Sequence, residues 1–257
     1  MGFPSREDHV AQPWPLEEEN IEHYMTLKFT INSEIVVENP TLAIEDAENL
    51  VIMLNGKNVE PKITGYYVDA SIKTVELPAL CCGENIVIVK IPFGKTTNVE
   101  YCYILGEFNV KVEGCVKTII APTNTIGFSS ITNQGMPFYG GNITYKVEIE
   151  TGDCSLEIKS SNYRGSLISV SIDGNPAGII AYAPYKVVLE NVKSGKHIVE
   201  LTLFGNRYNT FGALHNTDTA DLWYGPNYWR SLGDAWCYEY RLKDTGILSS
   251  PVISIYE

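Results

Sequence analysis

The chain has 257 residues and a formal net charge of −12, from 31 acidic and 19 basic residues. No run of Lys or Arg stands out, which excludes a surface that follows nucleic-acid phosphates, and no apolar run approaches the roughly 20 residues of a membrane-spanning helix. The amino terminus, MGFPSREDHV, lacks the apolar core of a secretory signal, so we expect a cytoplasmic protein unless the chain is a piece of a longer, exported one.

Residues 1–22 form a lead-in segment that is acidic, contains proline and has no sustained periodicity. Trp14, between Pro13 and Pro15, either pins this segment to a neighbouring domain or belongs to a disordered tail. After it, short β-branched runs alternate with Gly, Pro, Asn and Asp clusters, which is typical of strands and turns. These runs are TLKFTI, TLAIED, VIMLNGKNV, YYVDASI, TVELPAL, NIVIVKI, VEYCYIL and FNVKV. They predict a first antiparallel β-sandwich of jelly-roll type over residues 23–120.

A second β-sandwich is predicted over residues 121–257, after a stretch of turn-forming residues. Its strand-like runs are ITYKVEIE, CSLEIKS, LISVSIDGN, AGIIAYAP, YKVVLENV and HIVELTLFG. An irregular, aromatic insert follows over residues 205–236, and a loop of this length in a compact sandwich is more often functional than not. We predict that CYEYRL, residues 237–242, is the closing strand and that the remaining residues form a tail. The sequence therefore predicts an all-β fold of two tandem antiparallel sandwiches.

Two stretches of the chain share one pattern, which supports the tandem arrangement. VELPALCCGENIVIV (residues 75–89) aligns without a gap on VVLENVKSGKHIVEL (residues 187–201), and Gly83 falls on Gly195. Upstream of each copy, VIMLNGKNV and VSIDGNPAG contain an Asn-Gly and an Asp-Gly dipeptide, both strong hairpin signals. The two aligned glycines fit turn positions where a positive φ is needed.

Several phrases of the chain resemble those of a known family. From residue 205 onward they are GNRYNTFGALHN, WYGPNYW, GDAWCYEYRL and GILSSPVI. Earlier, NVEYCYILGEFNVKVEG and then QGMPFYGGNITY are similar to the segment that joins two sandwiches in that family, and QPW resembles the stretch before the first one. The family comprises large bacterial glycoside hydrolases of the α-L-rhamnosidase and β-galactosidase type, which carry galactose-binding-like jelly rolls beside the catalytic domain.

The resemblance covers nearly the whole chain as a set of phrases and includes no active-site signature. It implies galactose-binding-like sandwiches in an accessory, sugar-associated region of an enzyme for polysaccharide degradation. The chain departs from the family in one respect, because nothing in it is long enough or patterned to form the catalytic barrel. It therefore resembles either a part of a larger enzyme or a relative that lacks the catalytic domain, and such a domain is a candidate partner.

The insert combines aromatic rings with polar side chains. A sugar-binding surface needs flat faces for the C–H face of a pyranose and fixed polar groups for its hydroxyls. The candidate carbohydrate-binding residues are Trp223, Tyr224, Tyr228, Trp229, Arg207, Asn209, His215 and Asp221. The alternative is that these aromatics cap the sandwich or pack on another domain. Trp236 is the best candidate for a core residue, because it begins an alternating strand.

Catalysis by the chain itself has little support in its sequence. Glycoside hydrolysis needs two carboxyl groups about 5–5.5 Å apart for retention, or about 6.5–9.5 Å apart for inversion. The acids near the aromatics lie in a loop without a jelly-roll glycosidase signature: Asp218, Asp221, Asp234 and Glu239. No G-x-S-x-G motif is present, and the four histidines lack a spaced partner. His197 falls on Asn85 in the repeat, which predicts a strand or turn position for it and not a base.

Cysteines and acids give no diagnostic metal or cofactor motif. The six cysteines show no C-x-x-C spacing, and Cys81 and Cys82 are adjacent, so we expect reduced thiols, although the even count leaves a disulfide open. We predict no cofactor. The resemblance leaves open a structural Ca²⁺ near the first and last strands of a sandwich, with Glu148, Glu150 or Glu239 as ligands.

The hypothesis for function is a non-catalytic, carbohydrate-associated module of a glycoside hydrolase, which binds sugar or braces the catalytic domain. A purely structural or protein-interaction β-sandwich is the alternative, and a glycosidase in its own right is a third. We expect a carbohydrate ligand, and neither a nucleic-acid nor a membrane partner.

Overall fold

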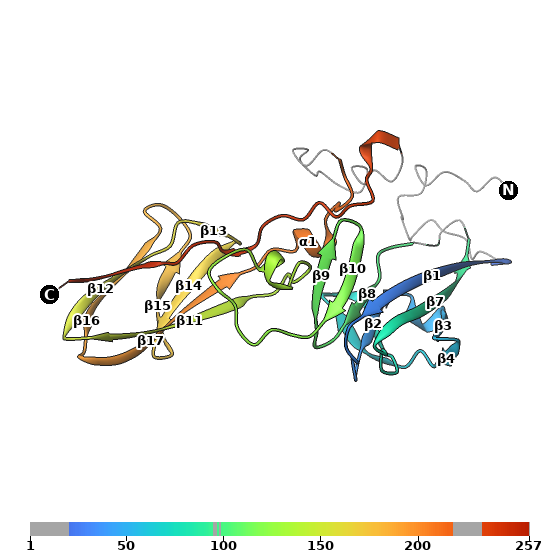
Figure 1. Cartoon of the computed structure of the whole chain (residues 1–257), viewed down its shortest axis with the longest axis horizontal. Coiled ribbons are helices and arrows are strands. Elements are labelled where there is room, and N and C mark those ends of the chain that lie inside the picture. The colour runs from blue at the N-terminus through green and yellow to red at the C-terminus, as the bar shows by residue number, and fades with distance from the viewer. Residues whose placement is uncertain (1–20, 95–96, 98, 218–232, 257) are drawn as a thin grey trace. The chain divides into compact units, whose positions relative to one another are not determined.

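The computed structural model describes residues 21–94, 97, 99–217 and 233–256. It confirms an all-β fold of antiparallel sandwiches (Figure 1). The chain divides into two compact units, of which the first comprises residues 1–108 and 118–121 and the second residues 109–117 and 122–257.

The strands of the first unit belong to two sheets, with the orders β4-β3-β7-β1-β10-β9 and β5-β6-β2-β8, and of these strands β9 falls in the part of the chain assigned to the second unit. The hairpin of β9 and β10 is where the chain is divided between the units. The strands are β1 (His23–Ser33), β2 (Thr41–Glu45), β3 (Val51–Leu54), β4 (Lys57–Val59), β5 (Ile63–Tyr67), β6 (Asp69–Glu76), β7 (Gly83–Phe93), β8 (Tyr103–Leu105), β9 (Asn109–Glu113) and β10 (Val116–Ile120).

Alternating burial explains why β7 forms and which way it faces. Val87, Val89 and Ile91 are buried, and the residues between them are more exposed, because successive side chains of a strand point to opposite faces. Leu42 and Val75, from the second sheet, belong to the same core. The run YYVDASI, expected as one strand, is split between β5 and β6 at Val68, whose φ is +67°.

The second unit has three sheets, with the orders β11-β17-β14-β15, β16-β12-β19 and β13-β18. Its core includes Leu156, Ile158, Ile168, Leu201 and Leu203, all fully buried. The strands are β11 (Ile143–Thr151), β12 (Cys154–Lys159), β13 (Tyr163–Arg164), β14 (Leu167–Ile172), β15 (Asn175–Ile180), β16 (Lys186–Val192), β17 (Gly195–Phe204), β18 (Gly246–Ile247) and β19 (Val252–Tyr256).

The two units repeat one strand topology. The order β4-β3-β7-β1 of the first unit corresponds to β15-β14-β17-β11 of the second, strand for strand and in the same chain sequence. In the facing sheets, β6-β2-β8 corresponds to β16-β12-β19. The two aligned stretches of sequence are therefore the same part of the two sandwiches, as the repeat predicts.

Turn geometry agrees with the turn residues of the repeat. Asn55 and Gly56 link β3 to β4 with φ values of 50° and 79°, and Asp173 and Gly174 link β14 to β15 with 49° and 77°. Two successive positive φ values are typical of a type I′ hairpin turn, which Asn-Gly and Asp-Gly favour. The aligned Gly83 and Gly195 also have positive φ, 100° and 149°, as predicted.

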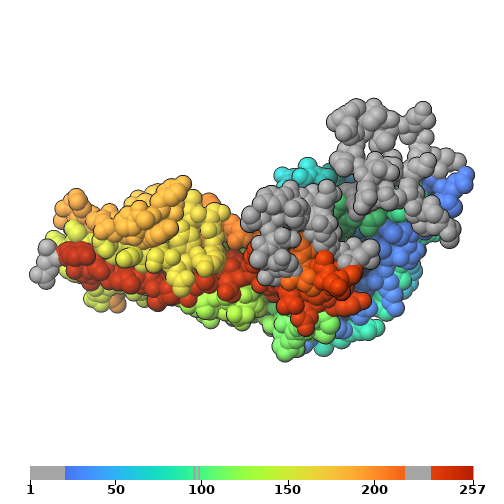
Figure 2. Space-filling model, turned by 90° about the horizontal axis from the view of Figure 1, so that it is seen from above, coloured from blue at the N-terminus to red at the C-terminus, as the bar shows by residue number. Residues whose placement is uncertain are grey.

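The end of the chain differs from the prediction. CYEYRL is not a strand, and the strand that closes the second unit is β19, inside the predicted tail. β19 pairs antiparallel with β12, and Ile253 lies opposite Ile158. Figure 2 shows this terminal segment, in red, as a continuous band on the surface of the second unit. The alternation in CYEYRL is local, whereas the pairing with β12 depends on the residue opposite each position.

Helices are minor in the described residues. They comprise α1 (Tyr208–Phe211) and 3₁₀ turns at Ala47–Asn49, Ile131–Gln134 and Gly233–Ala235. None of the helices in this part of the chain has the length and apolar character needed to cross a membrane. All six cysteines are free.

Candidate functional site

A shallow hollow of about 480 Å³ opens on the second unit, where the insert begins. Three separate parts of the chain line it: β13 and the residue after it, the start of the insert, and the residues before β18. The lining residues are Tyr163, Arg164, Gly165, Asn206, Tyr208, Lys243 and Asp244. Two phenol rings, an amide, two cations and one carboxylate therefore meet on one concave surface.

A buried amide joins two of these parts. Asn209 is 4% exposed, and its side chain donates to the carbonyl of Lys243 at 2.8 Å and accepts from the backbone N–H of Lys243 at 2.9 Å. Thr210, the next residue of α1, donates from its hydroxyl to the carbonyl of Phe138 at 2.9 Å. All three bonds are made by side chains that are largely removed from water, so breaking any of them would leave an unsatisfied polar group. α1 thus holds Lys243 in place.

The side chains at the start of the insert are ordered by local contacts. The Asn206 side-chain oxygen accepts from the backbone N–H of Tyr208 at 3.1 Å, at the first residue of α1. The Lys243 ammonium lies 3.9 Å from the centre of the Tyr208 ring, a cation–π distance. Lys243 and Tyr208 therefore position each other at the rim of the hollow.

Another part of the lining is β13, which pairs with β18 so that Arg164 lies opposite Gly246. Arg164 donates from one guanidinium nitrogen to the carbonyl of Tyr163 at 3.1 Å, and the Tyr163 hydroxyl donates to the carbonyl of Ile180 at 3.3 Å. Desolvation raises the pKa of Tyr163, so its hydroxyl stays a donor at neutral pH. A Cβ at Gly165 would come within 2.6 Å of a Leu203 methyl group and the Phe204 carbonyl, so the backbone approaches β17 too closely there for a side chain.

Among the described residues that line the hollow there is one carboxylate. It belongs to Asp244, whereas glycoside hydrolysis uses two. Of the other acids considered, Glu239 forms an ion pair with Arg241 at 3.7 Å, and Asp234 is exposed in a 3₁₀ turn. Asp218 lies outside the described residues, as does Asp221.

In the part of the chain that the structure describes, no three His, Cys, Asp or Glu residues are arranged so that they could hold a metal ion. Glu148 and Glu150 are both exposed on β11. A Ca²⁺ bound through one of them or Glu239, with backbone carbonyls, stays a prediction.

The structure places three of the predicted sugar-binding residues. Arg207 is exposed and lies between two lining residues in the chain, Asn206 and Tyr208. Asn209 is the buried amide that holds Lys243. His215 is half-buried, and Nδ1 of its ring lies 3.0 Å from the carbonyl of Cys237. The other predicted residues lie outside the described residues: Trp223, Tyr224, Tyr228, Trp229 and Asp221, as does Trp14 of the lead-in segment.

Trp236 is not a core residue, contrary to the expectation. It is half-buried and forms an isolated bridge with Asn216, and its ring centre lies 5.3 Å from that of His215 and 4.5 Å from that of Tyr238. The ring of Tyr240 is tilted against that of His215, with the two ring centres 4.7 Å apart. The expectation rested on an alternating strand at Trp236, and no strand forms there.

Sequence reasoning missed the lining of the hollow. Asn206 and Tyr208 lie in the phrase GNRYN at the start of the insert, so the density of polar and aromatic residues there was a usable signal. Tyr163, Arg164, Lys243 and Asp244 come from segments with no such density. Their approach to the insert depends on the β13–β18 pairing, which no local pattern predicts.

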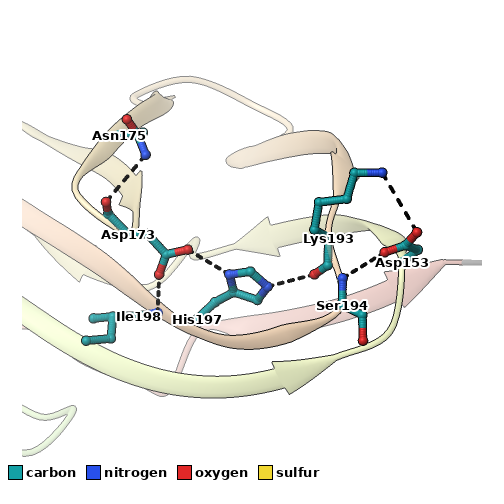
Figure 3. Close-up of polar contacts among 7 residues, drawn as sticks. All are labelled: Asp153, Asp173, Asn175, Lys193, Ser194, His197 and Ile198. Carbon is teal, nitrogen blue, oxygen red and sulfur yellow. Dashed lines mark hydrogen bonds and ion pairs between the residues drawn. The ribbon is translucent and has the colours of Figure 1, made fainter.

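A second polar cluster lies at the hairpin turn of the second unit (Figure 3). His197 Nδ1 lies 2.7 Å from a carboxylate oxygen of Asp173, and Nε2 lies 2.8 Å from the carbonyl of Lys193. Carboxylate and carbonyl oxygens only accept, so both ring nitrogens donate, which requires the protonated imidazolium. The bond to Asp173, and then that to Lys193, raises the pKa of His197, and the pKa of Asp173 is lowered by His197 and by the Ile198 N–H. His197 is thus at a strand position and holds a turn, as the repeat predicts.

No protein-family model matches the chain, and a search of curated proteins finds no match. Among solved structures, a rhamnosidase from Novosphingobium sp. PP1Y is similar over 89% of this chain and 22% of that chain, with 16% identity and a TM-score of 0.35. The apo form of the Pleurotus ostreatus lectin POL is similar over 73% of this chain and 69% of that one, with 9% identity and a TM-score of 0.23. The chain thus spans about a fifth of the rhamnosidase, and at such TM-scores we draw nothing about function from either likeness.

Proposed function

We propose that the second unit is a non-catalytic carbohydrate-binding module and that its sugar lies in the hollow beside α1. The observation that carries this proposal is the composition of the lining, where the rings of Tyr163 and Tyr208 meet Arg164, Asn206 and Asp244. Sugar sites combine an aromatic face with a few fixed polar groups, which set the orientation of the hydroxyls.

The residues that line the hollow are already held in position in the free protein, which supports binding. Buried hydrogen bonds from Asn209 and the pairing of β13 with β18 position two parts of the lining. A site that is already arranged spends less free energy on ordering side chains when a ligand binds. The predicted sugar-binding residues of the insert that lie outside the described residues, Trp229 among them, belong to the same proposal, because the insert begins at this hollow.

The wider setting is also a proposal. The sequence phrases resemble the accessory region of large glycoside hydrolases, so we infer that the module works beside a catalytic domain in polysaccharide degradation. Its own lining offers a single carboxylate, Asp244, which supports binding without cleavage. A cytoplasmic location is part of the same inference.

Isothermal titration calorimetry after a screen on a glycan array tests the proposal. We expect binding to an oligosaccharide, with at least about a fivefold loss in Tyr208→Ala, because losing a stacked ring costs about 1–3 kcal/mol in ring-stacking sites. Tyr182→Ala is the matched control, since Tyr182 is 86% exposed and lies outside the lining. Equal binding by both variants would move the sugar site away from the hollow.

The competing role is a structural or protein-interaction sandwich. Exposed apolar side chains on β16 and β19 favour it, with Val188 at 51%, Val252 at 59% and Tyr256 at 52% exposure. The absence of binding to any oligosaccharide, with tryptophan fluorescence that is blue-shifted and indifferent to sugar, would support this role. Turnover of an aryl glycoside would instead indicate a glycosidase.

A further inference from the structure

The charge of the hollow differs from that of the protein. The chain carries a net charge of −12, yet the lining contains two cations, Arg164 and Lys243, and one acid, Asp244. Both cations are exposed, and neither forms an ion pair with an acid in the part of the chain that the structure describes. Elsewhere in this unit Lys146, Lys186 and Lys193 each have an acidic partner. The hollow therefore presents positive charge that the fold itself does not neutralise.

Each cation is held in place without an acid. The backbone of Lys243 is fixed by two hydrogen bonds from buried Asn209, and its ammonium rests 3.9 Å from the Tyr208 ring centre. Arg164 lies in β13, and one of its nitrogens donates to the Tyr163 carbonyl. A guanidinium has five N–H donors in a planar fork that matches an oxyanion, so this contact uses only part of its capacity. The two cations come from separate segments of the chain that line one hollow.

We infer that the sugar bound in this hollow is acidic, with a carboxylate or sulfate group that lies between Arg164 and Lys243. The inference rests on the proposed function and adds the class of ligand to it. Asp244 has the complementary role, because a carboxylate accepts hydrogen bonds from sugar hydroxyls and repels a second anion. A sugar ring that carries an acidic group together with hydroxyls suits this lining.

Calorimetry with matched ligands tests the inference. Oligogalacturonate and its methyl ester have the same ring and linkage and differ in charge. We expect the acid to bind at least tenfold more tightly, since hydrogen bonds to charged groups contribute about 1.5–3 kcal/mol each. The advantage should shrink as salt is added. Arg164→Gln and Lys243→Gln should each remove most of it, whereas Lys159→Gln, an exposed lysine on β12 outside the lining, should leave it unchanged.

The outcomes separate this inference from the proposed function. If the acid and its ester bind equally and Tyr208→Ala abolishes the binding of both, the inference of an acidic sugar is wrong and the proposed sugar site remains supported. If neither these nor any other oligosaccharide binds, both proposals fail. A sulfated oligosaccharide that binds where oligogalacturonate does not would support the anionic class and identify a sulfate ester as its group. Circular dichroism of the variants checks folding, which these exposed substitutions should not disturb.

Discussion

The two units hold equivalent hairpin turns, β3–β4 and β14–β15, by hydrogen bonds between residues of different chemistry. In the first unit, Asn55 of the β3–β4 turn accepts from the N–H of Ile86 at 2.8 Å and donates to the side chain of Asn85 at 3.0 Å. Asn85 in turn donates to the carbonyl of Cys81 at 2.7 Å. We call Asn55 and Asn85 the amide pair.

The second unit repeats this chain of bonds with ionisable groups. Asp173 accepts from the N–H of Ile198 at 2.9 Å and from His197 at 2.7 Å, and His197 donates to the carbonyl of Lys193 at 2.8 Å. We call Asp173 and His197 the charged pair. Asp173 corresponds to Asn55, and His197 corresponds to Asn85. Only the bond within each pair differs in direction, because Asn55 donates to Asn85 whereas His197 donates to Asp173.

The difference follows from exposure. Asn85 is fully buried, and a neutral amide can be buried once its donors and acceptors are used. Its counterpart His197 keeps 13% of its side chain exposed and Asp173 keeps 45%, so water partly stabilises both charges and reduces the desolvation cost. Asn55 is also exposed, so the two turns differ at the position of Asn85 and His197. The same turn therefore tolerates an amide where that position is fully buried and an imidazolium where it is partly exposed.

The largest effect is expected from Asn85→Ala. This change removes the partners of the Cys81 N–H and carbonyl in a buried site, which should cost about 2–3 kcal/mol of the free energy of unfolding. The matched change His197→Ala should cost less, because water can reach the groups that it leaves. Urea unfolding of the full chain, with amide exchange at Ile86 and Ile198, measures both. A greater loss in His197→Ala would contradict the explanation by exposure.

Equal losses are expected from Gly56→Ala and Gly174→Ala. Both glycines have φ values near 78°, and a Cβ at either position would meet nothing within 4 Å, so only the backbone conformation opposes the change. Each should cost about 1–2 kcal/mol. Thermal unfolding of the two variants compares them. Unequal costs would show that the two turns are not equivalent.

A smaller effect should appear with pH at the turn of the second unit and not at the equivalent turn of the first. The pKa of His197 is raised, so its contribution is complete below 6.5, its ordinary value, and is lost as the pH rises through the folded value. The pKa of Asp173 is lowered, so its contribution is complete above 3.8 and is lost as the pH falls through the folded value. Between these limits the charged pair stabilises most.

Amide exchange measured against pH checks this prediction. After correction for intrinsic exchange, protection of Ile198 should fall from pH 6 to pH 9, while protection of Ile86 should not. The double variant Asp173→Asn with His197→Asn copies the amide pair into the second unit and should abolish the dependence. A dependence that survives in the double variant would assign the titration to another group.

The smallest expected effect is that of salt. The charged pair is partly exposed, so raising the ionic strength from about 0.05 M to 0.5 M should weaken protection of Ile198 slightly and leave that of Ile86 unchanged. The same exchange experiment measures it. An equal response at both positions would mean that salt acts on the whole fold and not on the charged pair.

Local patterns in the sequence were sufficient for much of the fold. The alternation in β7 and β17, the two hairpin turns and the glycines at 83 and 195 depend on neighbours within a few residues, so one chain segment determines each of them. The repeat could be recognised for the same reason. The split of one expected strand at Val68 shows the limit, because periodicity does not reveal a positive φ at a β-branched residue.

For the candidate site, the sequence indicated a region and not its lining. The aromatic and polar density of the insert pointed to the segment that contributes Asn206 and Tyr208, but Asn209 turned out to hold another lining residue in place. No pattern pointed to Arg164 or Lys243, since neither stands in an unusual stretch of sequence.

The sequence by itself thus determined most of the strands, the hairpin turns and the doubling of the sandwich, because side-chain alternation and turn propensity act over short distances. Only the tertiary structure decided which strand closes the second unit and which side chains share a hollow. Pairing β19 with β12 and β13 with β18 joins residues about a hundred positions apart along the chain, and that choice depends on the fit of whole sheets.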